Sequence, residues 1–265
     1  MYSPKHDQHI EGGHLKILKE TEALAKADMD GLLKSRRRVK SGIAGFDELV
    51  EGGLLNDRVY IICGPPGSGK TTFGCQYLAY GAIAGERGMY VTMMEDPRNI
   101  IMDMSSYPFN ILNHVKTGRL FFMDFGANFN PGVGSSIEFP TMSQLFAKVR
   151  EFVESKDVKR LVIDSISQVK FVGADLMTEK KQMVEFVRKL ESLDCTTILL
   201  SEMLDPDKYA PEHFLVHGVI FLYNFLSDGI MTRAVQILKM RGTRHESNMR
   251  KLEFTENGLR ISGQI

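Results

Sequence analysis

The sequence predicts an α/β fold with a mostly parallel β-sheet, helices on both faces of the sheet, and an antiparallel edge near the C-terminus. Short β-rich runs alternate with longer segments whose apolar residues recur at helical spacing, and such alternation requires the crossover connections of a parallel sheet. After residue 215 the β-rich runs follow one another with short connections, as antiparallel strands do. A glycine-rich turn joins the first long run to a helical segment.

The composition is that of an ordinary globular protein. The 265 residues carry 33 Lys and Arg against 33 Asp and Glu, and 43% are apolar. This balance excludes intrinsic disorder and a polyanion binder that acts through bulk positive charge, but not a local basic patch. No apolar run approaches the roughly 18 residues of a membrane span, and the first residues lack a hydrophobic signal core. Without CxxC spacing, Cys63, Cys75 and Cys195 are expected to be free thiols, so we expect a cytoplasmic protein.

Residues 1–38 differ from the rest, and we expect them to form a helical extension followed by a basic linker. Apolar residues between 18 and 32 recur at helical spacing, with Lys and Glu between them. The arginines at 36–38, with Lys40, are interpreted first as a solvated linker, because charge runs usually face water. A subunit contact and a nucleic-acid contact are the alternatives. Residues 39–265 are expected to form the main domain.

The remaining elements follow in order along the chain. The expected strands are 58–63, 88–93, 120–123, 160–164, 196–201, 219–225, 231–240 and 251–255. The expected helices are 71–84, 141–154 and 175–193. A turn at 227–229 joins two of the late strands into a hairpin. The segment 126–139, rich in Gly, Asn and Ser, is expected to be a loop, and loops of this length often carry function.

The strongest motif is GPPGSGKT, which begins at Gly64 and matches G-x-x-x-x-G-K-[ST] between a strand and a helix. Glycines let the backbone curl around an anion, and the N–H groups at the start of the following helix attract negative charge. Lys70 would place a cation near the β- and γ-phosphates of a nucleoside triphosphate, and the Thr71 hydroxyl would hold Mg²⁺. The predicted nucleotide-binding residues are Gly64, Pro65, Pro66, Gly67, Ser68, Gly69, Lys70, Thr71 and Thr72.

An acidic residue that ends a neighbouring strand is the second half of such a site. Asp164 ends the apolar run LVID, at the carboxyl edge of the predicted sheet, where ligands bind in open α/β folds. We expect Asp164 to hold Mg²⁺ together with Thr71, directly or through water.

Glu95 is the candidate for orienting the attacking water. It follows the strand 88–93, and a carboxylate there could accept a proton from that water. The alternative is that the acidic pair before Pro97 caps a helix. Ser201 and Glu202 end another strand at the same edge, and they either sense the γ-phosphate or satisfy a loop.

Several stretches together resemble the KaiC-like proteins, which are RecA-superfamily P-loop ATPases related to the circadian-clock ATPase KaiC. They are SGIAGFDEL (41–49) with Gly52 and Gly53, the phosphate loop, VTMMEDP (91–97), LVIDS (161–165) and LKMRGTRH (238–245). The first and last are more specific than the phosphate loop, and the resemblance covers about 39–261. It implies a RecA-like core in 39–265 and assembly into rings, often hexamers, with ATP between subunits.

The resemblance also implies a role for two residues of the last stretch. In the family, the Lys and Arg of a K-x-R-G motif reach the phosphates of the neighbouring subunit, and here they would be Lys239 and Arg241. A basic side chain supplied by the neighbouring subunit, called an arginine finger, neutralises the charge that develops on the γ-phosphoryl group. The alternative is that both are outward-facing residues of a strand, since alternation places them on one face in either case.

Two departures from the family pattern change the expected activity. The family carries two adjacent glutamates after the second strand, whereas this chain has Met94 and Glu95, so we expect slow turnover or none. Clock KaiC phosphorylates itself on neighbouring Ser and Thr residues after the fifth strand. Residues 202–226 contain neither, so autophosphorylation of that type is not expected.

Three functions fit these residues. The first is a ring ATPase that uses Mg²⁺ and couples its nucleotide state to assembly or to a partner protein. The second is a switch or scaffold that binds ATP and hydrolyses almost none of it, which Met94 favours. The third is a recombinase-like accessory of DNA repair. The loop 202–213 opposes the third, because it carries four acidic residues and one Lys, whereas Lys170 and the arginines at 36–38 keep it open. The K-x-R-G motif and the antiparallel late strands disfavour a small-molecule kinase.

Overall fold

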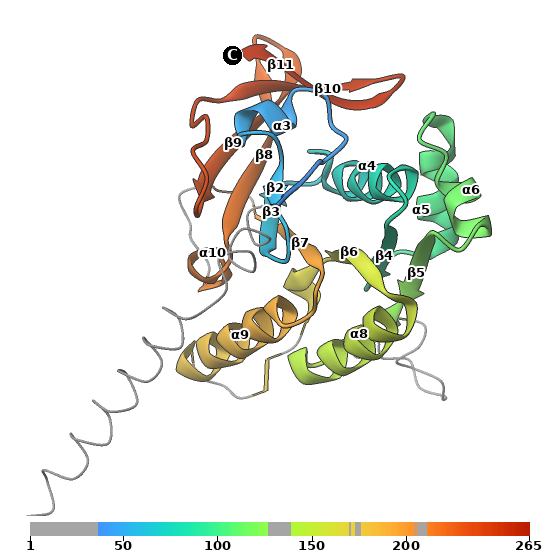
Figure 1. Cartoon of the computed structure of the whole chain (residues 1–265). Helices are drawn as coiled ribbons and strands as arrows, with labels where there is room; N and C mark the ends of the chain where they lie inside the picture. The colour runs from blue at the N-terminus through green and yellow to red at the C-terminus, as the bar shows by residue number, and fades with distance from the viewer. Residues whose placement is uncertain (1–36, 127–138, 170, 173–175, 204, 206–210) are drawn as a thin grey trace, which may run out of the picture. The chain divides into compact units, whose positions relative to one another are not determined.

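A nine-stranded β-sheet forms the centre of the unit 38–265 (Figure 1). The computed structural model describes residues 37–126, 139–169, 171–172, 176–203, 205 and 211–265. The strands are β3 (Val59–Gly64), β4 (Arg87–Thr92), β5 (Leu120–Asp124), β6 (Val158–Asp164), β7 (Thr196–Glu202), β8 (Gly218–Ser227), β9 (Ile230–Met240), β10 (Arg250–Thr255) and β11 (Gly258–Gln264). Six of them run parallel in the order β8-β3-β7-β6-β4-β5. Strands β9, β10 and β11 continue the sheet beyond β8 in antiparallel pairing.

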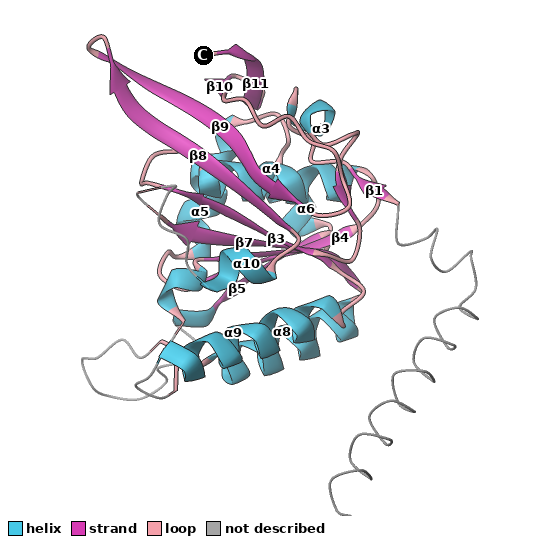
Figure 2. Ribbon diagram, turned by 90° about the vertical axis from the view of Figure 1, so that its left-hand side faces the viewer, coloured by secondary structure: helices cyan, strands magenta, loops and turns pink. Residues whose placement is uncertain are grey.

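Helices cover both faces of the sheet and make three layers (Figures 1 and 2). One face carries α4 (Lys70–Ile83), α5 (Pro97–Asp103) and α6 (Ile111–Lys116), and the other carries α8 (Met142–Lys156) and α9 (Leu176–Glu191). Alternate residues of β3 enter the two cores. Tyr60 and Ile62 pack in the core that contains α4, whereas Val59 and Ile61 pack in the core that contains α8 and α9. Burial on both faces explains why the central strands read as nearly continuous apolar runs.

The predicted fold class is confirmed, and the predicted strands and helices agree with the structure to within about two residues at each end. The hairpin turn is confirmed as well, because Asp228 and Gly229 have φ angles of 51° and 79°, as a two-residue hairpin turn requires. The prediction missed the last strand, β11, and the short elements α5, α6, α3 (Phe46–Leu49), β1 (Arg38–Val39) and β2 (Leu54–Leu55). Apart from β11, which has seven residues, these segments are too short to establish a period that separates them from loops.

Several other predictions can be compared with the structure, and two cannot. Cys63, Cys75 and Cys195 are buried thiols outside any disulfide, as expected. Among the described residues, no helix is both long and apolar enough to cross a bilayer. The helix expected within 1–36 and the loop expected at 126–139, apart from its ends, lie outside the described residues.

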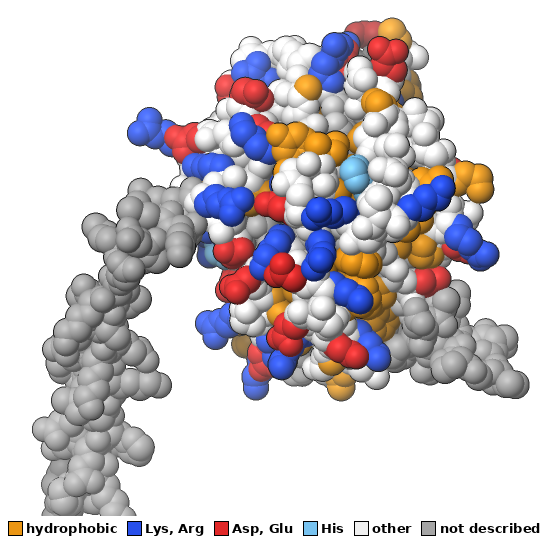
Figure 3. Space-filling model, turned by 45° about the vertical axis from the view of Figure 1, so that its right-hand side comes forward, with side chains coloured by type: hydrophobic (Ala, Val, Ile, Leu, Met, Phe, Trp, Pro, Cys, Tyr) orange, Lys and Arg blue, Asp and Glu red, His pale blue; other side chains and the backbone are white. Residues whose placement is uncertain are grey.

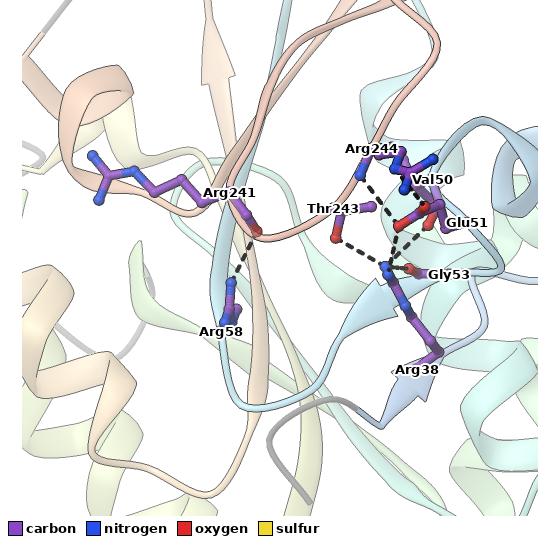
Figure 4. A network of polar contacts seen from close by, with 8 residues as sticks. All are labelled: Arg38, Val50, Glu51, Gly53, Arg58, Arg241, Thr243 and Arg244. Carbon is purple, nitrogen blue, oxygen red and sulfur yellow. Dashed lines mark hydrogen bonds and ion pairs between the residues drawn. The ribbon is translucent and has the colours of Figure 1, made fainter. Parts of the chain in front are cut away.

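Arg38 is held firmly by the unit whose first strand it begins (Figure 4). Its guanidinium donates hydrogen bonds to the carbonyl oxygens of Val50 and Gly53, each 3.0 Å away, and to Thr243 Oγ1 at 2.9 Å. It also forms an ion pair of 3.1 Å with Glu51. These contacts tie the start of β1 to the segment that follows β9.

The order of the strands brings four strand ends to one edge of the sheet. In the parallel register, Gly64 of β3 lies opposite Glu202 of β7, and Asp164 of β6 lies opposite Thr92 of β4. Each of these residues ends its strand. Ligands of open α/β sheets bind outside such carboxyl ends, so this edge is where a functional site is expected.

Candidate functional site

The loop between β3 and α4 leaves backbone N–H groups uncapped at the start of the helix. Gly69 is the N-cap of α4, with a φ of 104°, and it has no side chain to accept a hydrogen bond from the first turn. Gly64 must lack a side chain, because a Cβ there would lie 2.3 Å from the carbonyl oxygen of Leu222. Free N–H groups and the positive end of the helix dipole make this helix start a binding site for an anion.

The phosphate loop forms one wall of a cleft of about 360 Å³. The cleft is lined by Pro66, Gly67, Gly69, Lys70, Thr71, Thr72, Thr92, Met94, Glu95, Asp164, Ser165, Gln168, Glu202 and Phe254. The structure therefore brings the predicted metal residues, the predicted base and most of the predicted loop residues into one space. Gly64, Pro65 and Ser68 do not line the cleft. The carbonyl oxygens of Gly64 and Pro65 accept hydrogen bonds from Lys70, and Ser68 is fully buried.

Lys70 is bonded to the loop itself. Its ammonium group donates to the carbonyl oxygens of Gly64, at 2.8 Å, and Pro65, at 3.0 Å. Burial lowers the pKa of Lys70, while the nearby charges of Asp164 and Glu202 act in the opposite direction. A desolvated ammonium whose hydrogen bonds go to neutral carbonyls interacts more strongly with an anion that enters the cleft.

Asp164 is surrounded by donors at the end of β6. Thr71 Oγ1 donates to Asp164 Oδ2 at 3.3 Å, and the buried Tyr90 hydroxyl donates to the same oxygen. Burial raises the pKa of Asp164, whereas the hydrogen bonds from Tyr90 and Thr71 and the charge of Lys70 lower it. Burial also raises the pKa of Tyr90 well above its usual value, so the phenol keeps its proton and remains a donor.

The donor set at Thr71 and Asp164 fits a magnesium ion. Mg²⁺ is held in such sites by one or two protein oxygens, with the other positions taken by water and phosphate. A hydroxyl and a carboxylate that already meet at 3.3 Å, at the floor of a polar cleft, supply those protein oxygens. The same cleft leaves room for the remaining ligands.

Glu95 lines the cleft and has no part in capping the next helix. The cap of α5 is Asp96, whose side chain accepts from the Arg98 N–H at 2.8 Å, and Pro97 is the first helical residue. Asp96, and not Glu95, is therefore the acidic residue that caps the helix. Partial desolvation and the negative charge of Asp164 raise the pKa of Glu95. Met94, whose side chain is 69% exposed, lines the same cleft.

Ser201 and Glu202 differ in what they contact. Ser201 is buried, and its hydroxyl lies 3.2 Å from Ser167 Oγ in the turn after β6. The Glu202 N–H donates to the same Ser167 oxygen at 3.0 Å, while the Glu202 side chain lines the cleft. These contacts favour the interpretation that the Ser201 hydroxyl serves as a hydrogen-bonding partner for the loop after β6, and not as a sensor of the γ-phosphate.

Lys239 and Arg241 do not line the cleft of their own chain. The Lys239 ammonium donates to the carbonyl oxygens of His213 and Phe214, both at 3.0 Å, in the short helix α10 (Pro211–Leu215). The Arg241 guanidinium donates to the same Phe214 oxygen at 2.6 Å. Burial and the neighbouring Arg241 lower the pKa of Lys239 to about 8. In Figure 4 the Arg241 side chain points away from Arg58, which binds the Arg241 carbonyl oxygen at 2.9 Å.

Tyr90 and Phe254 are among the residues of the site that sequence reasoning missed. Tyr90 lies inside β4, where its ring reads as another buried apolar residue, and nothing local indicates that its hydroxyl reaches Asp164. Phe254 of β10 lines the cleft and is 41% exposed. The sequence carries no signal for Phe254, because alternation places it on the same side of β10 as the buried Leu252.

Comparison with known proteins finds a consistent set of relatives. A family model described as "ATPase: KaiC" matches residues 39–264. The UPF0273 protein of Methanopyrus kandleri is 30% identical over 236 residues, which are 84% of this chain and 91% of that protein. The circadian clock oscillator protein KaiC of Synechococcus elongatus is 29% identical over 230 residues, which are 84% of this chain and 44% of that protein. This chain therefore spans less than half the length of the clock protein.

A solved structure extends the comparison to three dimensions. The crystal structure of a KaiC-like protein from Pyrococcus horikoshii matches with a TM-score of 0.73 at 31% sequence identity. The match covers 86% of this chain and 99% of that one. The fold, including the mostly parallel sheet and its antiparallel C-terminal strands, is thus shared over nearly the whole of the neighbour.

Proposed function

Because the chain belongs to the KaiC family of ATPases, we propose that it binds Mg·ATP in the cleft and hydrolyses it slowly within a ring of identical subunits. The ring would couple its nucleotide state to assembly or to a partner protein. The observation that carries the proposal is the meeting of an uncapped helix start, Lys70 and the Thr71–Asp164 pair in one cleft of about 360 Å³.

The phosphates would bind at the start of α4. Lys70 would turn from the carbonyl oxygens of Gly64 and Pro65 to the β- and γ-phosphates, which are stronger acceptors because they are charged. Thr71 and Asp164 would hold Mg²⁺, which supplies charge neutralisation between the β- and γ-phosphates. Phe254 would offer its exposed ring to the base, which gives the cleft an apolar end.

Glu95 would orient the attacking water at the other end of the phosphates. Its carboxylate lines the cleft, and its raised pKa makes it a stronger base than an ordinary glutamate. Lys239 and Arg241 would act on the phosphates of the adjacent subunit, since neither lines the cleft of its own chain. A ring with head-to-tail contacts places one such pair beside each cleft.

The proposal is tested by titrating the purified protein with ATP in a calorimeter, with and without Mg²⁺, and by measuring phosphate release at several protein concentrations. Magnesium-dependent binding is expected, together with a rate per subunit that rises as rings form. Lys70→Ala should abolish binding, and Glu95→Gln should bind ATP but release no phosphate. Absence of heat with Mg·ATP in folded protein would overturn the proposal.

The second candidate is a switch that binds ATP without hydrolysing it, and Met94 favours it. A thioether lines the cleft beside Glu95, where the related family pattern has a second glutamate. Met94→Glu separates the two candidates. If the chain is a slowed ATPase, the added carboxylate should raise kcat, whereas a switch whose cleft cannot orient water should stay inactive in both forms.

The structure offers less support for a nucleic-acid partner. On the face shown in Figure 3, Lys and Arg side chains are interspersed with Asp and Glu side chains. Affinity for a phosphate backbone comes from basic groups gathered together, and this face does not gather them.

A further inference from the structure

The phosphate loop is held from outside by the hairpin of β8 and β9. The amide of Asn224 in β8 donates to the carbonyl oxygen of Pro66 at 3.2 Å, and the guanidinium of Arg233 in β9 donates to that of Gly67 at 2.9 Å. Asn224 and Arg233 are direct partners across the hairpin. A matched pair of donors therefore meets two consecutive carbonyl groups at the tip of the loop.

We propose that Arg233, with Asn224, is a positioning residue that sets the phosphate loop in the conformation that receives the triphosphate. The inference rests on the proposed function, since it concerns how the same cleft binds ATP. In a trans peptide the carbonyl and the next N–H point in opposite directions. Holding the Pro66 carbonyl against the hairpin therefore turns the Gly67 N–H to the other side of the loop, and holding the Gly67 carbonyl aims the Ser68 N–H back at the Pro65 carbonyl oxygen, 3.3 Å away.

The hairpin donors matter most once the nucleotide is bound. In the absence of nucleotide, the Lys70 ammonium donates hydrogen bonds to the carbonyl oxygens of Gly64 and Pro65. When Lys70 moves to the phosphates, those carbonyls are left with the longer contacts from the Met203 and Ser68 N–H groups, at 3.4 and 3.3 Å, whereas Pro66 and Gly67 keep their side-chain donors. A carbonyl that rotated toward the cleft would place a negative dipole against a polyanion, and the hairpin prevents that rotation at two positions.

Arg233 also contacts a second part of the cleft lining, the ring of Phe254. Its guanidinium carbon lies 4.9 Å from the centroid of the Phe254 ring, in a cation–π contact, and Phe254 lines the cleft. A Cβ on Gly69 would approach the same ring to 3.2 Å, which shows how closely Phe254 lies over the start of α4. One guanidinium thus fixes the loop that would hold the phosphates and the ring that would face the base.

The test compares two ligands in Arg233→Ala, because the two contacts of Arg233 predict different losses. Dissociation constants are measured for Mg·ATP and for inorganic tripolyphosphate with Mg²⁺, which has no base. Loss of a charged hydrogen bond to the loop should weaken both ligands about 10- to 100-fold. If Arg233→Ala weakens Mg·ATP but leaves the binding of tripolyphosphate unchanged, Arg233 acts only through Phe254. That result would overturn the positioning role.

Companion variants exclude a merely structural effect. Arg233→Lys retains a cationic donor and should recover part of the lost affinity, and Asn224→Ala should weaken both ligands by a smaller factor with KM raised more than kcat is lowered. Arg150→Ala on α8 removes an exposed guanidinium paired with Glu154 and should change neither constant. If Arg233→Ala fails to fold, the first two variants decide the question. Wild-type protein that binds neither ligand refutes the proposed function instead.

Discussion

Mixing two inactive variants should restore activity if Lys239 and Arg241 serve the cleft of a neighbour. Arg241→Ala keeps its own cleft intact but lacks the finger, and Glu95→Gln keeps the finger but lacks the base. Each variant alone should be inactive, because every cleft in its ring is incomplete. In a mixed ring, a cleft with Glu95 can stand beside a subunit with Arg241, and that junction contains every required group.

The size of the recovery follows from the arrangement of the residues. Both side chains bond to carbonyl oxygens of α10, and neither lines the cleft of its own chain. Under the proposed trans role, the finger and the cleft of one subunit therefore belong to different junctions. In a ring of head-to-tail contacts mixed at equal amounts, about a quarter of the junctions combine an intact cleft with an intact finger. A missing finger lowers kcat about 10³- to 10⁵-fold, so the mixture should exceed its parents at least about 100-fold.

The assay is steady-state phosphate release after the two variants are mixed and allowed to exchange subunits, with native mass spectrometry to show that mixed rings form. Wild-type protein mixed with Arg150→Ala serves as the control for exchange and should keep the wild-type rate. Mixed rings whose rate equals the mean of the two inactive parents would contradict the assignment. Full activity of Arg241→Ala alone would contradict it as well.

Three further predictions concern the carboxylates of the cleft. Burial raises the pKa of Asp164, so the contribution of this carboxyl to stability is complete below about pH 4 and is lost as pH rises through the raised folded pKa. Asp164→Asn should therefore raise Tm at pH 7 but not at pH 4. The same variant should abolish magnesium-dependent ATP binding. The raised pKa of Glu95 predicts that kcat falls on the acid side at a pH above the ordinary glutamate range, and that this limb is absent from any residual rate of Glu95→Gln. Tyr90→Phe removes a hydrogen bond that lowers the pKa of Asp164, so the magnesium concentration for half-maximal ATP binding should rise about tenfold at neutral pH and more at lower pH; equal magnesium requirements would show that Tyr90 only fills the core.

The parts of the site that sequence predicted are those whose chemistry is local. The phosphate loop contains its own glycines, lysine and threonine, and its function follows from their spacing alone. Asp164 could be found because a strand pattern ends on it at the expected edge of the sheet. Each of these inferences needs only a few consecutive residues and the fold class.

The residues that sequence missed depend on which strands become neighbours. Tyr90 reaches Asp164 because β4 lies directly beside β6, although the two residues are 74 positions apart. Arg233 reaches the phosphate loop because β8 pairs with β3 on one side and β9 on the other. Phe254 comes to the start of α4 only through the antiparallel strands beyond them. No periodicity in a single chain specifies such an order, so these roles became visible only in the assembled sheet.

The charges of the cleft argue that magnesium and ATP bind as one complex. Of the charged residues in the described part of the chain, Asp164, Glu95, Glu202 and one cation, Lys70, line this space. A free triphosphate would meet more negative than positive charge there, and desolvation makes the repulsion stronger than it would be in water. A magnesium ion held by Asp164 would reverse the sign of the charge beside this buried carboxylate. The same ion would relieve the carboxylate of its unfavourable burial, so stability gained on ligand binding should require both components together.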